Sequence, residues 1–426
     1  MGSVGRERQS EIYRGGAQGI RPIVPSSWPA LEAAARRAMS PEAWAYIAGS
    51  SGGESTASHN RAALDAVQLV PRVLRDVENR DLSIELFGRR YPAPIIAAPV
   101  GVLELAHPQA DLGAAAAAAA LGLPFVISSQ ASVPMEEIAA AKPSAPRWFQ
   151  LYWSSSDELV ASFLERAEAI DVDAIVVTLD THVLGWRPRD LDLAYLPFIR
   201  GQGIAQYTSD PVFARLVTER IAAPAPDRAR PKISRETIRT LIAMTKNHPG
   251  RFWSNLRSPI PRAAVETFLD VFSRSSLTWE HLTFLREHTT RPILLKGIQH
   301  PDDARQAVDH GIDGIIVSNH AGRQLDGAIG SAAALPRVMD AVGDRIPVLF
   351  DSGVRSGADV AKVLAMGARA ALVGRPYAYG LAAAGAAGAE AVLRNIVAEF
   401  DLALALTGHR TPGELDSDSL ADRVAP

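Results

Sequence analysis

Eight short apolar runs alternate with helical patterns from about residue 94 onward, and this alternation constrains the fold more than any other feature. Nearly continuous apolar runs of this length are typical of parallel strands that are buried on both faces. Eight such repeats favour a closed (β/α)8 barrel, an α/β TIM barrel, over an open doubly wound sheet. The runs span 94–100, 124–129, 147–152, 174–180, 292–297, 314–320, 347–353 and 370–376.

One gap interrupts the repeat, because the fourth run starts at residue 174 and the fifth at residue 292. We predict a long insertion over 190–278, and part of this insertion is rich in proline and basic residues. A long loop at this end of a barrel covers the active site, so the insertion is interpreted as a lid, with a disordered surface insertion as the alternative.

The rest of the chain is predicted to form one structural domain with the barrel. The N-terminal helical segment would span 1–90, the barrel 91–380, and a C-terminal helix and tail 381–426. Helices are expected at 27–48, 156–170, 300–311, 356–367 and 389–408, where apolar spacing, acidic first turns or capping residues indicate them.

Composition excludes several kinds of chemistry. The 426 residues carry a formal net charge of -3, and this small charge does not indicate a nucleic acid or an anionic membrane as a partner. There is no cysteine, so disulfides, thiolate nucleophiles, iron–sulfur clusters and Cys-ligated zinc are excluded, and we predict no metal site. The first 16 residues lack the apolar core of a signal peptide, and the alanine-rich stretch 112–127 is too short to span a bilayer. We expect a cytoplasmic protein.

Polar side chains gather where the predicted strands end, which is where barrel enzymes hold their catalytic groups. His320 could accept a proton at neutral pH, and Asp180 could orient that histidine. Arg187 and Arg323 are candidate ligands of a carboxylate. Tyr152 and Gln150 face the same mouth, and Lys296 fits a Schiff base, a cofactor contact or a salt bridge.

Glycine-rich loops follow the seventh and eighth strands, at 351–357 and 374–376. Loops at these positions form the usual phosphate site of the barrel fold, and here they supply Gly353, Arg355, Gly374 and Arg375. A phosphate site, a lysine on the inner wall and a His–Arg pair imply a phosphorylated ring cofactor and a small carboxylate held by two arginines.

These residues resemble those of the FMN-dependent α-hydroxy acid oxidase and dehydrogenase family. The resemblance runs from about residue 11 to 416 and rests on four motifs: LKGIQHPDDA (295–304), SNHAGRQLDG (318–327), DSGVRSGADVAKVLAMGA (351–368) and VGRPYAYG (373–380). The stretch VVTLDTHVLGWRPRDL (176–191) looks closest to the lactate 2-monooxygenase branch.

The resemblance assigns a role to each matching residue. It implies that His320 is the base, that Asp180 supports it, and that Tyr152 faces the substrate hydroxyl. It implies that Tyr46, Arg187 and Arg323 bind the substrate carboxylate. Lys296 would stand beside the ring of FMN. The further FMN contacts would be Pro99, Val100, Gly101, Ser129, Gln150, Thr178, Ser318, Asp351, Gly353, Arg355, Gly374 and Arg375.

The implied reaction is the oxidation of a small L-2-hydroxy acid by FMN and O2. The resemblance favours a lactate 2-monooxygenase-like reaction, which gives a carboxylic acid one carbon shorter, CO2 and water. The alternative is an oxidase that releases the 2-oxo acid and hydrogen peroxide. The other functional hypotheses are a dehydrogenase, an FMN isomerase and a non-catalytic FMN barrel. Relatives form tetramers and octamers, so a homo-oligomer is expected. Ala321, His182 and Glu104 depart from the family pattern, and they leave the substrate side chain open.

Overall fold

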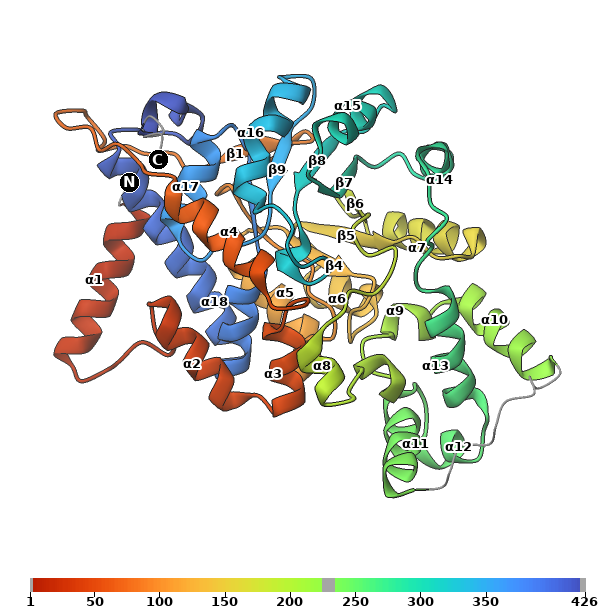
Figure 1. Ribbon diagram of the computed structural model, residues 1–426. Coiled ribbons are helices and arrows are strands. Elements are labelled where there is room, and N and C mark those ends of the chain that lie inside the picture. The colour runs from red at the N-terminus through yellow and green to blue at the C-terminus, as the bar shows by residue number, and fades with distance from the viewer. Residues whose placement is uncertain (1–2, 224–233, 422–426) are drawn as a thin grey trace.

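The chain closes into a parallel barrel of eight strands, which confirms the predicted fold. The computed structural model describes residues 3–223 and 234–421, and Figure 1 shows the barrel strands surrounded by helices. Strand order around the barrel follows chain order, and the last strand pairs with the first, so the sheet has no free edge. Each strand lies within its predicted run, except that the fifth ends one residue later. The strands are β3 (Ile95–Ala97), β4 (Phe125–Ser128), β5 (Arg147–Tyr152), β6 (Ile175–Thr178), β7 (Ile293–Ile298), β8 (Gly314–Val317), β9 (Val348–Phe350) and β10 (Ala371–Val373).

The barrel interior is apolar toward the amino ends of the strands and polar toward their carboxyl ends. Alternate residues of a strand point to the same face, so every second residue enters the interior. In β5, Trp148 is buried in the interior apolar cluster, while Gln150 and Tyr152 line a cavity at the mouth. In β7, Leu294 and Lys296 repeat this order. Strand alternation therefore delivers polar side chains to one end of the barrel.

Helices surround the barrel, and their ends follow local capping chemistry. The Ser156 hydroxyl accepts a hydrogen bond from the backbone N–H of Leu159, and the Ser356 hydroxyl accepts one from Asp359. The helices predicted at 156–170, 300–311 and 356–367 are present as α7, α15 and α17. The set comprises α5 (Ala110–Ala120), α6 (Met135–Ala141), α7 (Asp157–Ala169), α14 (Leu282–His288), α15 (Pro301–Asp309), α16 (Ser331–Val342), α17 (Gly357–Ala365) and α18 (Arg375–Leu406).

Helix α18 is longer than predicted. It begins at Arg375 instead of residue 389, because Pro376 suits a first turn, where a backbone N–H has no helical partner. A kink at Ala384 and Gly385 divides it. By length and composition α18 could cross a membrane, but more than half of its most apolar stretch is buried, and the helix packs against α1, α2, α5 and α17.

The N-terminal segment is not purely helical, and the single helix predicted over 27–48 is wrong. Pro41 has no N–H to continue a helix, and the Ser40 hydroxyl starts a new one by accepting from the N–H of Ala43. Residues 84–91 form an antiparallel hairpin instead of a helix. The elements are α1 (Val4–Ala17), α2 (Trp28–Ala38), α3 (Pro41–Ala48), α4 (Ser55–Ala66), β1 (Ile84–Leu86) and β2 (Arg89–Tyr91).

The hairpin closes the amino-terminal end of the barrel. Leu86 and Tyr91 belong to the apolar cluster of the barrel interior. The Trp148 indole N–H donates to the Tyr91 hydroxyl at 3.2 Å, and Phe87 packs edge-on against the same indole. The sequence pattern of 84–91 is too short for its period to reveal this pairing.

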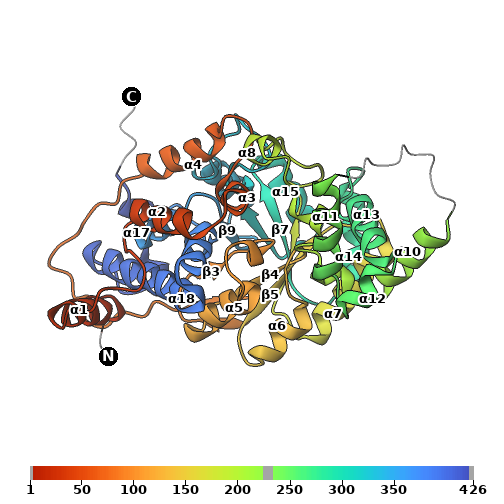
Figure 2. The same cartoon turned by 90° about the horizontal axis from the view of Figure 1, so that it is seen from below.

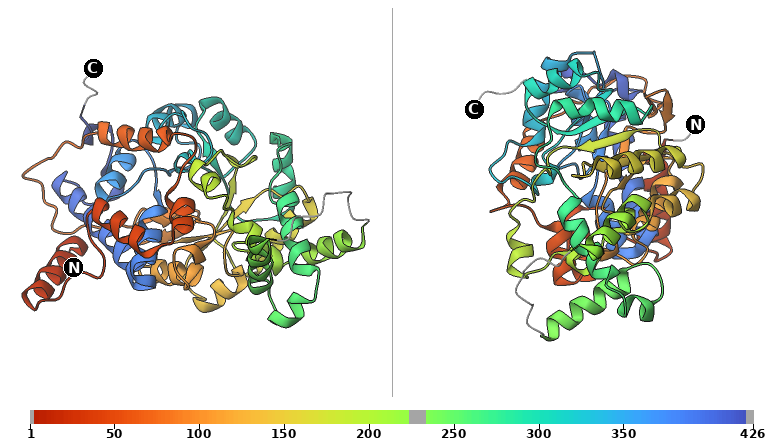
Figure 3. Two further views of the ribbon diagram at one scale, coloured as in Figure 1. Left: turned by 60° about the horizontal axis from the view of Figure 1, so that its bottom comes forward. Right: turned by 90° about the vertical axis from the view of Figure 1, so that its right-hand side faces the viewer.

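The predicted insertion lies between β6 and β7 and is largely helical. Figures 1, 2 and 3 place α10–α13 on the side of the molecule opposite α1. Most of the predicted Pro-rich, basic stretch falls at 224–233, outside the described residues. The helices are α8 (Pro188–Asp192), α9 (Ala205–Thr208), α10 (Pro211–Ala222), α11 (Arg235–Asn247), α12 (Phe252–Leu256) and α13 (Ile260–Val271).

Aromatic packing and one buried carboxylate attach the insertion to the barrel. The ring of Tyr207 packs edge-on against Phe163 of α7 and Phe268 of α13, with centroids 5.0 and 4.8 Å apart. Asp210 accepts hydrogen bonds from Ser162 and Arg166 of α7 and from the first turn of α10. The described part of the insertion is therefore a packed layer, which excludes the alternative of a disordered insertion for those residues.

Replacing Asp210 should destabilise the protein because the Ser162 hydroxyl and the first-turn N–H groups of α10 lose their buried acceptor, and Arg166 keeps only its ion pair with Glu136. We expect Asp210→Ala to lower the free energy of unfolding by about 3 kcal/mol. Asp270→Ala is the matched control, because the ion pair of Asp270 with Arg220 is exposed and should contribute less than about 1 kcal/mol. Urea denaturation of both variants measures the difference, and equal losses would contradict the anchoring role of Asp210.

Candidate active site

The predicted site residues converge on one cavity at the carboxyl ends of the strands. Segments far apart in the chain contribute to it, from α3 through the barrel strands to the start of α18. Three predicted residues, Ser129, Asp180 and Ser318, do not line it. The predicted residues that do are Tyr46, Pro99, Val100, Gly101, Gln150, Tyr152, Thr178, Arg187, Lys296, His320, Arg323, Asp351, Gly353, Arg355, Gly374 and Arg375.

Ser129 does not face the predicted cofactor position. Its hydroxyl donates to the Gln150 carbonyl at 2.6 Å and accepts from the Tyr152 N–H, so it joins β4 to β5. Its neighbour Ser128 lines the cavity and donates to the side-chain oxygen of Gln150, whose amide nitrogen donates to Thr178. The correction follows from the two-residue period of a strand, because neighbouring residues face opposite sides.

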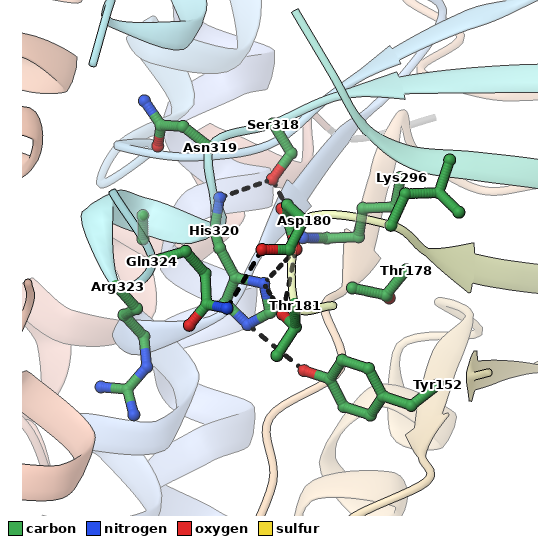
Figure 4. A network of polar contacts seen from close by, with 12 residues as sticks. Tyr152, Thr178, Asp180, Thr181, Lys296, Ser318, Asn319, His320, Arg323 and Gln324 are labelled. Carbon is green, nitrogen blue, oxygen red and sulfur yellow. Dashed lines mark hydrogen bonds and ion pairs between the residues drawn. The ribbon is translucent and has the colours of Figure 1, made fainter. Parts of the chain in front are cut away.

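A histidine–carboxylate pair stands at the mouth (Figure 4). His320 Nδ1 lies 2.7 Å from Asp180 Oδ1, and His320 Nε2 lies 3.5 Å from the Tyr152 hydroxyl. Burial lowers the pKa of His320, and Lys296 lowers it further, against the opposing charge of Asp180. The imidazole is therefore neutral at neutral pH. With Nδ1 held by Asp180, Nε2 is the nitrogen available to accept a proton from a ligand.

The backbone at His320 is strained. His320, Ala321 and Gly322 have φ angles of 56°, 55° and 77°, and left-handed residues other than glycine store energy, most often at functional sites. The Ser352 hydroxyl accepts the N–H of Ala321 and fixes this turn. Ala321, which departs from the family pattern, therefore adds backbone strain beside His320 and leaves the histidine in the cavity.

Lys296 contributes a buried positive charge to the cavity lining. Its Nζ lies 2.9 Å from Asp351 Oδ2 and donates to the Ser318 hydroxyl at 2.9 Å. Burial opposes this charge, but Asp351 and Asp180 outweigh it and raise the pKa of Lys296. Ser318 therefore supports Lys296 from beneath instead of lining the cavity.

Gly297 lets the strand that carries Lys296 approach Asp180. Its φ is 110°, and a Cβ there would lie 2.9 Å from the Cβ of Asp180. The register of β7 against β8 shifts between Lys296 and Ile298 at this point. A glycine is required because both the conformation and the space exclude a side chain.

Two arginines, the buried Arg187 and the partly buried Arg323, line the cavity without a carboxylate partner in the described residues. Arg187 donates to the Arg323 carbonyl and to the Gln324 side chain, while Arg323 donates to the carbonyls of Tyr46 and Gly49. Burial and the charge of Arg323 lower the pKa of Arg187 to about 10, which leaves it protonated at neutral pH. Buried cations that bond only neutral oxygens form a site for an anion, and their planar groups suit a carboxylate.

A second pair of arginines in the cavity, Arg375 and Arg355, has the same character and fits a phosphate. Arg375 donates to the carbonyls of Ile47, Gly49 and Ala321, and it makes no ion pair within the described chain. Arg355 lies over the Trp28 ring at 4.3 Å and likewise pairs with no described carboxylate. Burial lowers the pKa of both guanidinium groups. A phosphate there would neutralise both charges, so these residues fit the phosphate end of FMN.

Two residues that depart from the family pattern lie outside the cavity lining. His182 is exposed and bonds the Leu179 carbonyl, and Glu104 accepts from the N–H of Gly203 in the insertion. Sequence reasoning missed the lining residues Ser128, Gln130 and Phe272. The two-residue period of β4 would have indicated Ser128 and Gln130, but no local pattern marks Phe272, which lies at the end of the insertion.

Comparison with known proteins decides the family. Residues 35–422 match the model of the FMN-dependent dehydrogenase family. The chain belongs to this family. It is an FMN-dependent α-hydroxy acid oxidoreductase, and FMN is its cofactor.

The relatives include oxidases and dehydrogenases. The FMN-dependent alpha-hydroxy acid dehydrogenase qulF of Penicillium citrinum is 41% identical over 97% of this chain and 94% of its own. An L-lactate oxidase of Lysinibacillus sphaericus is 40% identical over 89% of this chain and 88% of its own. A mandelate oxidase structure is 34% identical with a TM-score of 0.74, covering 93% of this chain and 98% of that chain.

The strain at Ala321 predicts a stabilising substitution. Ala321→Gly should raise the free energy of unfolding by about 1 kcal/mol, because glycine adopts a positive φ without a steric penalty. Ala33→Gly is the control in the exposed middle of α2 and should lower it by about 0.5–1 kcal/mol. Urea denaturation of FMN-saturated protein gives both values, and a loss in both variants would disprove strain at Ala321.

The His320–Asp180 pair predicts the acid limb of the pH profile. Since the neutral imidazole is the base, kcat/KM should fall as the pH falls through a value below 6.5. Asp180→Asn removes the charge that raises the pKa of His320, so this midpoint should move to lower pH. We also expect kcat to drop on the order of 10²-fold. Asp192→Asn, an exposed control on α8, should change neither value, and a midpoint that rises in Asp180→Asn would contradict the pairing.

Proposed function

We propose that the enzyme oxidises an L-2-hydroxy acid with His320 as its base. The observation that carries the proposal is the neutral imidazole, with Asp180 at Nδ1 and Nε2 available, in one cavity with two arginines that lack carboxylate partners. Oxidation of a 2-hydroxy acid to a 2-oxo acid removes two electrons and two protons, so it requires a base beside a carboxylate site.

Each residue has a distinct task in this proposal. Arg187 and Arg323 bind the substrate carboxylate and fix which face of the substrate is presented. Tyr46 and Tyr152 act as hydrogen-bond donors, because burial raises the pKa of both hydroxyls and keeps them protonated. His320 Nε2 accepts a proton from the substrate.

Asp180 is a positioning residue behind His320. It holds the ring and stabilises the imidazolium that forms. Burial opposes the ionised form of Asp180, but the charges of His320 and Lys296 outweigh it and lower its pKa. Asp180 therefore stays ionised through the proton transfer.

FMN would lie along the cavity and accept the electrons. Pro99, Val100, Gly101, Gln150 and Thr178 would hold its ring, with Ser128 in the role first assigned to Ser129. Lys296 would present its positive charge to the ring. Asp351, Gly353, Arg355, Gly374 and Arg375 would hold the phosphate end.

The favoured overall reaction is that of a lactate 2-monooxygenase: a 2-hydroxy acid and O2 give a carboxylic acid one carbon shorter, CO2 and water. The resemblance over 176–191 supports it. The insertion supports it as well, because Phe198 and Phe272 line the cavity and both pack against Phe268, and such a layer over the site would slow the escape of a 2-oxo acid. The second candidate is an oxidase that releases the 2-oxo acid and hydrogen peroxide, and the lactate and mandelate oxidase relatives favour it.

A product assay separates the two candidates. FMN-loaded protein is supplied with L-lactate and with L-mandelate in air, and peroxide, CO2 and organic acids are followed together. The expected result is acetate or benzoate with one CO2 per turnover and little peroxide. Stoichiometric peroxide with pyruvate or benzoylformate would make the enzyme an oxidase.

A further inference from the structure

Gln130 presents an amide to the cavity with nothing in the described chain to bind it. It follows β4 two residues after Ser128 and four after Val126, so its side chain points to the same face as theirs and lines the mouth of the barrel. Its backbone is fixed, because its N–H donates to the Ser128 hydroxyl at 3.0 Å and its carbonyl accepts from Val102 at 2.8 Å. The side-chain amide makes no hydrogen bond to residues 3–223 or 234–421.

An amide in this position is costly unless a ligand pairs with it. Gln130 is only 7% exposed, and its amide offers one acceptor and two donors. A buried polar group without a partner weakens a complex, so a ligand that satisfies the amide is favoured over one of equal shape that does not. The apolar wall of the same cavity includes Leu184, Phe198 and Phe272.

Gly101 makes room for the Gln130 side chain. A Cβ at position 101 would lie 3.0 Å from the Cβ of Gln130 and 3.3 Å from its Oε1. An alanine there would push the amide out of place, because such contacts are tighter than ordinary packing. Gly101, which follows β3, and Gln130, which follows β4, therefore pack side by side in the cavity lining.

We propose that Gln130, seated against Gly101, selects 2-hydroxy acids whose side chain carries a hydrogen-bonding group such as an amide or a hydroxyl. This inference rests on the proposed function, since Arg187, Arg323 and His320 hold the carboxylate and the hydroxyl-bearing carbon. The substrate side chain then extends along the apolar wall and ends at the Gln130 amide. L-lactate, whose side chain is a methyl group, leaves that amide unpaired.

The test compares two acids of nearly equal shape. L-malic acid 4-monoamide ends its side chain in an amide, whereas L-2-hydroxy-4-methylpentanoate ends it in two methyl groups. Both are titrated into the FMN-loaded His320→Ala protein, which binds without turnover, and the Kd values are measured by calorimetry. We expect the amide to bind about tenfold more tightly, as one buried hydrogen bond allows.

Variants at positions 130 and 101 test whether these two residues cause the preference for the amide-bearing acid. Gln130→Leu should reduce the ratio of the two Kd values to about one, and Gly101→Ala should reduce it only where Gln130 is present. Gln306→Leu, an exposed glutamine on α15, is the control and should keep the tenfold ratio. The FMN absorption spectrum and FMN affinity of Gln130→Leu should stay unchanged, because the proposal gives Gln130 a substrate contact.

Each other outcome overturns a different statement. Equal Kd values for the two acids in the His320→Ala protein would disprove selection by Gln130, while the product assay could still establish the reaction. A changed FMN spectrum with an unchanged ratio in Gln130→Leu would assign the amide to the cofactor instead. Binding of neither acid, together with no turnover of any 2-hydroxy acid by the unmutated protein, would overturn both the substrate class and this inference.

Discussion

The two-residue alternation of a closed barrel is the constraint on which the rest of the structure depends. Eight parallel strands with no free edge send every second residue into one interior, and that interior changes from apolar to polar along the strands. Trp148 and Leu294 fill the amino-terminal half, while Gln150 and Lys296 reach the mouth from the same strands. The apolar layer supplies the stability that allows charged groups to be buried directly above it.

The charge balance at the mouth makes the site receptive to anions. Arg323 and Arg375 are both held by carbonyl groups of the segment 46–49, which is the last turn of α3 with its C-terminal cap Gly49. One short segment therefore orients the arginine at the carboxylate end and the arginine at the phosphate end. Neutral carbonyl oxygens hold these cations in place without cancelling their charge, so the attraction for a ligand is kept. This coupling explains why the N-terminal segment, outside the barrel itself, is required for the site.

Much of the site could be predicted because strand ends are recognisable from sequence. The runs that became β6, β7 and β8 end in Asp180, Lys296 and His320, and fold geometry brings these ends together. The prediction was wrong at Ser129, because a shift of one residue along a strand moves the side chain to the other face of the sheet. It was also wrong at Pro41, where a proline interrupts a helical pattern. The hairpin at 84–91 and the aromatic packing of the insertion depend on contacts between distant segments, and no local pattern contains them.

The hairpin of β1 and β2 closes the amino-terminal end of the barrel. Leu86 and Tyr91 fill that end together with Trp148, and the layer above them is solid. The amino-terminal end of the barrel is therefore filled with side chains, while the cavity lies at the carboxyl ends of the strands. The two ends of the barrel use different residues of the same strands, as Trp148 and Gln150 of β5 show. Substitutions in the apolar layer can change thermal stability, while substitutions at the mouth can change which ligands bind. The two properties are therefore free to evolve independently.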